Sequence, residues 1–236
     1  FGEGLHGVMQ KVSYKLKGIL NGIDYELNDP MNDPYIPHGF SHENLEGKIQ
    51  NKLALQEELG LEVREDVPLF GIISRLTDQK GFDLIAESIE ELLSQDIQLV
   101  VLGTGERRYE DMFRYFSYKY PGKVSANITY NGALAQKIYA ASDFFLMPSL
   151  FEPCGLSQLM ALRYGSVPIV RETGGLKDTV IPYNKFTGEG IGFTFSNYDA
   201  YDMLQAVYRA LEAYQNQKSF KEIIEKGMVM DYSWKA

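Results

Sequence analysis

The sequence predicts an α/β fold built on a doubly wound parallel sheet. Predicted strands alternate with predicted helices along most of the chain, an order typical of parallel sheets with helices on both faces. Several strand candidates, such as IQLVVL at residues 97–102, are continuous apolar runs, as expected for strands buried on both sides. Residues 143–176 are predicted to form a strand, a loop, a helix, a second strand and a second loop, so two loops should meet at one edge of the sheet.

The chain before the first strand of the sheet is predicted to be helical or irregular. Apolar residues at helical spacing predict a helix over residues 5–16, and GILNGID at residues 18–24 is expected to form a short strand or a bend. Three prolines within residues 28–42 predict a long irregular connection. A second helix is expected over residues 44–59, ending at Gly60.

The elements of the sheet are assigned from apolar runs that end at turn residues. Strands are expected at residues 68–76, 97–102, 128–130, 144–147 and 167–170, with a glycine-rich edge strand or hairpin at residues 188–195. Helices are expected at residues 82–93, 106–118, 134–141, 156–164, 199–214 and 220–230. Pro148 ends one strand, and Pro153 with Gly155 marks the turn that follows it.

The composition is that of an ordinary globular protein and excludes several classes of partner. Hydrophobic residues make up 44% of the chain and charged residues 23%. A formal net charge of −9 argues against nucleic-acid and anionic-membrane partners. One cysteine, Cys154, cannot form an internal disulfide; with no signal peptide or membrane segment in evidence, a cytoplasmic protein is expected. Both ends look cut, so we expect a fragment of a longer protein.

Two strand-to-helix loops within residues 143–176 form the candidate ligand site. Free N–H groups at helix N-termini suit a phosphate, and open α/β sheets bind ligands beyond the carboxyl ends of their strands. The first loop carries a carboxylate, Glu152, and the second contains Thr173, Gly174 and Gly175. Backbone that suits phosphate, together with one acid, indicates a ligand with a charged part and a polyhydroxyl part, such as a nucleotide sugar.

A third loop carries two basic residues. SRLTDQKG follows a predicted strand and places Arg75 and Lys80 five residues apart. Both side chains can reach one diphosphate, Arg through paired N–H groups and Lys as a compact charge. The alternative is an exposed loop with two solvated cations. GTGE at residues 103–106 lacks the third glycine of a dinucleotide fingerprint, so a tight turn is the better interpretation.

The remaining candidate residues do not indicate one chemistry by themselves. Taken alone, a glutamate such as Glu152 beside a proline is more often a turn residue than a catalyst, and a cysteine such as Cys154 is more often a small inert side chain than a nucleophile. Tyr130 suits either core packing or a platform on which a base stacks.

His38 and His42 are four residues apart, but Pro37 and Gly39 argue against a helix that would bring them together. No Asp-x-Asp pair is present to hold a divalent ion. We therefore expect no metal site.

Four segments, taken together, resemble one enzyme family. GILNGID, SRLTDQKG, FEPCGL and RETGGLKDTV occur in the order and at the spacing found in the C-terminal half of bacterial glycogen synthase and plant starch synthase. The likeness covers almost the whole chain and implies the C-terminal Rossmann-like domain of a two-Rossmann-domain (GT-B) glycosyltransferase. FGEGLHGV at the start resembles the segment that leaves the N-terminal domain. Residues 1–16 would then be a remnant of the interdomain connection, and residues 17–236 the nucleotide-sugar-binding domain.

The resemblance implies a retaining enzyme that transfers glucose from ADP-glucose to the non-reducing end of an α-1,4-glucan, with no metal or other cofactor. Arg75 and Lys80 would neutralise the diphosphate leaving group, and Glu152 would hold glucose hydroxyls near the reacting carbon. The donor-binding residues implied by the same likeness are Asn21, Gln79, Tyr130, Cys154, Gly155, Leu156, Thr173, Gly174 and Gly175. Among these, Tyr130 matches the position that stacks on adenine.

The expected partners are ADP-glucose, an α-1,4-glucan and the family's N-terminal domain, which this sequence lacks, with no nucleic acid and no membrane. We expect the chain alone to bind nucleotide weakly and to transfer no glucose. Two other interpretations stay open: a nucleotide- or glycan-binding module without a catalytic role, and a related sucrose- or trehalose-forming transferase that uses UDP-glucose. The incomplete glycine fingerprint argues against an oxidoreductase.

Overall fold

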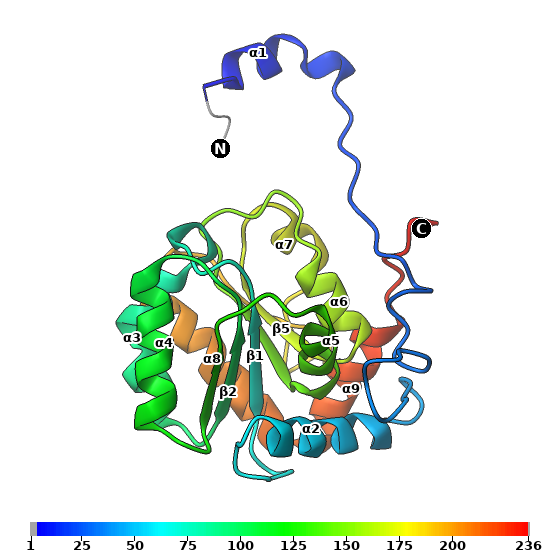
Figure 1. The fold of residues 1–236 in the computed structure, drawn as a ribbon. Coiled ribbons are helices and arrows are strands. Elements are labelled where there is room, and N and C mark those ends of the chain that lie inside the picture. Colours follow the sequence, from blue (N-terminus) through cyan, green and yellow to red (C-terminus); the bar gives the residue numbers. More distant parts are fainter. Residues whose placement is uncertain (1–3, 236) are drawn as a thin grey trace.

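A six-stranded parallel sheet organises the protein (Figure 1). The computed structural model describes residues 4–235, and the strands within them are β1 (Leu69–Ile73), β2 (Gln98–Leu102), β3 (Val124–Asn127), β4 (Phe144–Met147), β5 (Val167–Arg171) and β6 (Phe193–Phe195). They lie in the order β3-β2-β1-β4-β5-β6, and every neighbouring pair is parallel. The predicted doubly wound sheet is confirmed, and its direction of winding changes between β1 and β4.

Helices cover both faces of the sheet. Within the described residues the helices are α1 (His6–Lys11), which lies apart from the sheet, and α2 (Glu46–Glu58), α3 (Phe82–Ser94), α4 (Arg107–Lys119), α5 (Gly132–Ala141), α6 (Ser157–Arg163), α7 (Gly174–Thr179), α8 (Ala200–Gln215) and α9 (Gln217–Val229), with the 3₁₀ turns η1 (Ser13–Lys15) and η2 (Asp78–Lys80). Helix α3 contacts α4 and α8 on one face, and α2 contacts α5 on the other. Figure 1 shows α3 and α4 on one side of the sheet and α5 on the opposite side.

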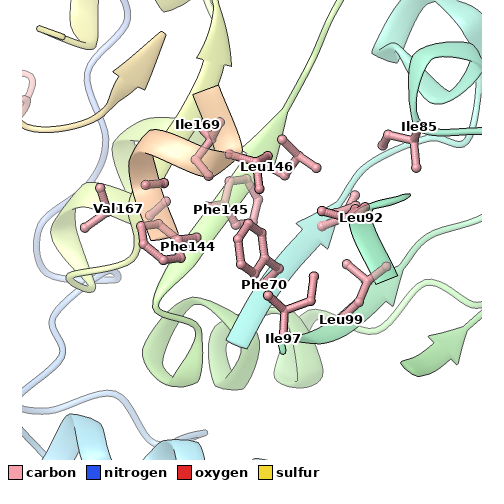
Figure 2. Packing of buried hydrophobic residues seen from close by; sticks show 14 of the residues in the cluster. Phe70, Ile85, Leu92, Ile97, Leu99, Phe144, Phe145, Leu146, Val167 and Ile169 are labelled. Carbon is pink, nitrogen blue, oxygen red and sulfur yellow. The ribbon is translucent and has the colours of Figure 1, made fainter. Parts of the chain in front are cut away.

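The hydrophobic core follows from the alternation of side chains along β1. Phe70 points to the face covered by α3 and α8, whereas Leu69 joins Leu55 of α2 and Ile138 of α5 on the other face. Figure 2 shows Phe70 beside Phe144 of β4, and their ring centroids are 5.0 Å apart. Both faces of the strand are therefore buried, as its continuous apolar run predicted.

The strand predicted at residues 128–130 is wrong. The sheet is instead completed by β3, in which Val124 lies opposite Leu99 and Asn127 lies opposite Leu102 of β2. As an edge strand, β3 has a single neighbour, and only its first two residues are buried. Its sequence, VSAN, consequently lacks the apolar run by which a strand was recognised, and the residues predicted as a strand lie in the loop that follows it.

The N-terminal helix is shorter than the predicted span of residues 5–16. It is divided into α1 and η1, separated by Val12, and neither piece contains a buried residue. In Figure 1, α1 stands away from the sheet. A division of the chain after residue 16 stays a prediction, and residues 1–3 of the proposed connection lie outside the described part of the chain.

The segment that follows runs beside the end of the chain. Ile23 N–H donates to the carbonyl oxygen of Tyr232 at 2.8 Å, and Ile23 also forms a parallel bridge with Ser233. The hydroxyl of Tyr25 donates to the carbonyl oxygen of Met230 at 2.8 Å. Residues 23–25 are thereby held against the C-terminal segment of the chain, whereas the residues before them are not.

Lys48 of α2 connects three elements inside the protein. Its side chain is buried, and its amine donates to the carbonyl oxygens of Ala140, Ser142 and Tyr164 at 3.0, 2.9 and 3.0 Å. These carbonyls lie at the C-terminal ends of α5 and α6, where helices have no backbone donor of their own to offer. Since a Lys ammonium carries three N–H donors, one side chain satisfies all three oxygens.

We predict that Lys48→Met destabilises the protein by about 3 kcal/mol, because it leaves three buried carbonyl oxygens without a donor. Urea denaturation measures the change. Lys218→Met, on the exposed side of α9, is the matched control and should change stability by less than about 0.5 kcal/mol. Equal losses in the two variants would show that the buried amine has no special role.

Candidate active site

The candidate site lies where the strand order reverses. The chain after β1 continues through η2 and α3 to β2, whereas the chain after β4 continues through α6 to β5 on the other side. Because the two connections diverge, a crevice opens at the carboxyl ends of β1 and β4. A cavity of about 280 Å³ occupies this crevice, and its polar lining consists of Ser74, Lys80, Ser149, Glu152 and Ser157. Gly155 and Leu156 also line it.

Backbone contacts hold the two loops together. The N–H of Leu150 donates to the carbonyl oxygen of Gln79 at 3.0 Å. Gly81, which follows η2, has φ +79°, and a Cβ atom there would lie 2.1 Å from the carbonyl oxygen of Pro148. A left-handed backbone in so close a contact requires glycine. The loop after β1 is thus fixed against the loop after β4.

Lys80 and Glu152 meet inside the crevice. The Lys80 Nζ lies 2.5 Å from the Glu152 Oε2, and the two side chains are only 17% and 9% exposed. The hydroxyl of Ser149 lies 3.4 Å from the same carboxylate oxygen. The structure therefore brings together one basic and one acidic residue that the sequence placed at the ends of neighbouring strands.

The glycine loop after β5 lies against the backbone of the Glu152 loop. A Cβ atom on Gly174, whose φ is +47°, would lie 2.0 Å from the Glu152 carbonyl oxygen, and one on Gly175 would lie 2.0 Å from that of Cys154. The Gly175 N–H donates to the Glu152 carbonyl oxygen at 3.1 Å. In this structure the Gly175 N–H is already used in a hydrogen bond between the two loops. That it donates to a phosphate or a sugar stays a prediction, and so does the expected position of Thr173 beside the phosphate.

Gln158 is a site residue that the sequence did not reveal. It is fully buried in α6, and its Nε2 lies 3.1, 3.0 and 3.1 Å from Cys154 O, Gly155 O and the Thr179 hydroxyl oxygen. Gly155 has φ +74°, a conformation that glycine adopts readily. The amide fixes this turn and ties it to α7. No spacing pattern distinguishes a buried helix glutamine from an exposed one.

A cluster of polar side chains braces the loop after β1. The Asp78 Oδ1 accepts hydrogen bonds from the Tyr109 hydroxyl and from Arg108 Nη2, the latter at 2.6 Å. Both bonds lower the pKa of the Asp78 carboxyl, and the bond from Tyr109 has the larger effect. The Tyr198 hydroxyl, from the loop before α8, contacts the Asp78 carbonyl oxygen at 3.0 Å and the Asp83 carboxylate. The turn that carries Lys80 is therefore held by α4 and by the loop before α8.

Arg171, at the end of β5, supports the loop that carries Glu152. Its Nη1 donates to the Leu150 carbonyl oxygen at 3.0 Å, and its guanidinium lies 5.4 Å from the centre of the Tyr198 ring. Within residues 4–235 its buried Nε has no hydrogen-bond partner. The sequence analysis did not assign this residue, although RETGGL places an arginine at a strand end beside the glycine loop.

Four other predicted site residues make no hydrogen bond or ion pair with Lys80 or Glu152 among the described residues. Arg75, Asn21 and the Gln79 side chain are exposed, and Tyr130 is 95% exposed. Across the described residues, no hydrogen bond or ion pair connects any of these side chains to Lys80 or Glu152. Tyr130 follows β3 and so lies at the same edge of the sheet as the cavity. The donor-binding roles of these four residues stay predictions.

The described residues show neither a membrane span nor a cluster of metal ligands. No helix in residues 4–235 has the length and apolar character needed to cross a bilayer. Nor do three His, Cys, Asp or Glu side chains gather there as a group that could hold a metal ion. The expectation that the reaction needs no metal or other cofactor stays a prediction.

Comparison with known proteins identifies the family. Residues 57–227, which include the whole sheet and both loops of the crevice, match the family described as glycosyl transferases group 1. The chain belongs to this family. The predicted fold class, the Rossmann-like domain of a GT-B glycosyltransferase, is confirmed with it.

Curated relatives of this group 1 glycosyl transferase are glycogen synthases. The chain is 58% identical to that of Clostridium novyi (strain NT), over 99% of this chain and 49% of the relative. It is 55% identical to that of Clostridioides difficile (strain 630), over 100% of this chain and 49% of the relative. The resemblance inferred from four motifs is thereby confirmed, and the chain spans about half the length of the curated relatives it matches.

Solved structures agree with this assignment. The catalytic domain of starch synthase IV from Arabidopsis thaliana, bound to ADP and acarbose, superposes with a TM-score of 0.93 at 39% identity, over 99% of this chain and 49% of that one. Sucrose-phosphate synthase from Thermosynechococcus elongatus superposes with a TM-score of 0.60 at 20% identity, over 85% of this chain and 48% of that one. The second likeness shows a shared fold only.

The buried ion pair predicts unequal effects of removing its two charges. Lys80→Met leaves the Glu152 carboxylate buried with Ser149 as its one remaining hydrogen-bonding side chain among the described residues, which should cost about 3 kcal/mol of stability. Glu152→Gln keeps an oxygen that accepts from the amine, and should cost about 1 kcal/mol. Urea denaturation of both variants and of Lys218→Met tests this difference. A larger loss in Glu152→Gln than in Lys80→Met would contradict the assignment.

Proposed function

We propose that this chain is the donor-binding half of a retaining glucosyltransferase that moves glucose from ADP-glucose to the non-reducing end of an α-1,4-glucan. The observation that carries the proposal is the meeting of Lys80 and Glu152 in the crevice between β1 and β4. A cation and a carboxylate side by side suit a ligand with a diphosphate and a hexose. The glycogen synthases among its relatives support the choice of glucan, and the ADP bound to starch synthase IV supports that of adenine nucleotide.

The two members of the ion pair can both serve the donor without separating. A Lys ammonium has three N–H donors, so Lys80 can keep its bond to Glu152 and offer two more to phosphate oxygens. A carboxylate has two oxygens, and the bond from Lys80 occupies Oε2 of Glu152, which leaves Oε1 to accept from glucose hydroxyls. In this arrangement the charge on the leaving diphosphate develops beside a cation that is already in place.

Arg75 has a different part in the proposal. Its side chain is exposed at the edge of the crevice loop, and no ion pair occupies it among the described residues. A guanidinium can therefore turn to a bound diphosphate and contact it through two N–H groups. Tyr130, equally free of the core, is proposed to stack on the adenine ring.

The cavity also bears on the stereochemical course. Among the described residues that line it, Glu152 is the sole carboxylate. A retaining glycosidase uses two carboxyl groups about 5 Å apart, one of them as nucleophile. We propose instead that glucose is transferred on one face of the sugar, with an oxygen of the departing ADP taking the proton of the acceptor hydroxyl.

In this proposal, glucose transfer also requires a domain that this sequence does not contain. Half of each curated relative has no counterpart here, and we propose that a preceding N-terminal domain supplies the acceptor surface. Residues 5–16, exposed throughout apart from Val12, would form the connection to that domain. We also propose that the protein acts in the cytoplasm.

Single substitutions in the protein that carries both domains test this function. Lys80→Ala, Arg75→Ala and Glu152→Ala should each lower kcat for transfer of labelled glucose from ADP-glucose to glycogen by about 10²- to 10³-fold. A module that only binds nucleotide would lose affinity with kcat unchanged. UDP-glucose should be the poorer donor, and residues 1–236 alone should transfer no glucose. Unchanged kcat in all three variants would contradict the proposal.

A further inference from the structure

A loop before β6 lies at the end of the sheet away from the proposed donor site. Residues 180–192 connect α7 to β6, with Tyr183 N–H donating to the Gly192 carbonyl oxygen at 2.7 Å and Ile191 N–H to that of Ile181 at 2.9 Å. Because β6 runs parallel to β5, this loop enters the sheet at the amino ends of the strands, opposite the crevice at their carboxyl ends. Whatever binds here does not compete for the space between β1 and β4.

The tip of this loop holds an exposed aromatic ring on a fixed backbone. The Asn184 Oδ1 accepts from Phe186 N–H at 2.9 Å, and the Asn184 carbonyl oxygen accepts from Gly188 N–H at 2.8 Å. Lys226 of α9 donates to the Gly188 carbonyl oxygen at 2.6 Å. Phe186 nevertheless remains 89% exposed. The ring is therefore presented to solvent by a preorganised turn, which lowers the entropic cost of binding a ligand on it.

A groove of about 780 Å³ lies between this tip and the helices α8 and α9. Its volume is within the range of about 300–1,000 Å³ that is common for ligand sites. Phe186, Tyr183 and Phe193 contribute rings to its lining. Asn184 and Asn216 contribute amides whose Nδ2 groups have no partner among residues 4–235, although both Oδ1 atoms are used within the chain.

The charges of the groove balance. The Lys185 Nζ lies 3.0 Å from Glu212 Oε1, and Arg209 Nη2 donates to the Thr194 carbonyl oxygen at 2.7 Å. With Glu189, the lining carries two cationic and two acidic side chains. This balance does not favour phosphates or cations.

The exposed ring of Phe186 and the half-buried ring of Tyr183 offer apolar faces beside amide N–H groups and the Glu189 carboxylate, whereas Phe193 is only 3% exposed and forms the floor. This combination suits a neutral ligand with apolar faces and many hydroxyls, which describes a carbohydrate.

We propose that this groove binds a segment of α-1,4-glucan and holds the polymer on the enzyme at a distance from the reacting end. The identity of the glucan rests on the function proposed above. A polymer has many equivalent units, so one chain or branch can occupy the groove while another reaches the donor site. Two linked contacts raise the apparent affinity for a polymer well above that of either contact alone.

The test compares two equally exposed aromatic residues. Phe186→Ala removes the ring at the groove, and Tyr118→Ala removes one that is 86% exposed on α4, outside it. Affinity electrophoresis in gels containing glycogen measures the dissociation constant, and calorimetry with ADP confirms that each variant keeps the donor site. Phe186→Ala should bind glycogen about tenfold more weakly, whereas Tyr118→Ala should bind as the unaltered protein does.

Equal glycogen affinity in Phe186→Ala and the unaltered protein would overturn the proposal. It would also be overturned if the unaltered protein bound no glycogen while it still bound ADP, and that outcome would leave the donor site in place. A failure to transfer glucose from ADP-glucose would instead count against the proposed function. The two ideas can thus fail separately.

Discussion

The reversal of strand order between β1 and β4 is the constraint on which the rest of the structure depends. Side chains at the ends of adjacent parallel strands meet only if their loops leave in different directions and keep the space between them open. Gly81 then allows the first loop to approach the second, and the contact from Leu150 to Gln79 fixes their separation. The pairing of Lys80 with Glu152 is a consequence of this backbone arrangement.

The ion pair itself is costly to bury and so depends on its surroundings. Desolvation of two charges exceeds their attraction unless the geometry is good and neighbours add hydrogen bonds. Here the lysine turn is braced through Asp78, and the glutamate loop is supported by Arg171. This cost is better explained by function than by stability. A cation and an acid held in place before the ligand arrives need little reorganisation when charge develops on a leaving group.

The sequence correctly predicted the site residues whose positions follow from the ends of strands. It did not predict those whose positions depend on contacts between residues far apart in the chain. Lys80 and Glu152 could be placed together because each follows an apolar strand in a parallel sheet. The hydrogen bonds to Asp78 could not be predicted, because Tyr109 and Tyr198 lie 31 and 120 residues further along the chain. Edge strand β3 escaped recognition because one exposed side removes the need for an apolar sequence. Arg75 was placed in the site by the same loop as Lys80, and Asn21 by motif likeness alone; no contact among the described residues supports either placement.

A crystal structure of the protein with ADP-glucose is the most direct test of the central claim. The account predicts that the diphosphate lies in the crevice between β1 and β4, within hydrogen-bond distance of the Lys80 amine. A glucose hydroxyl should then contact Glu152. A diphosphate bound elsewhere, with Lys80 and Glu152 contacting only each other, would contradict it.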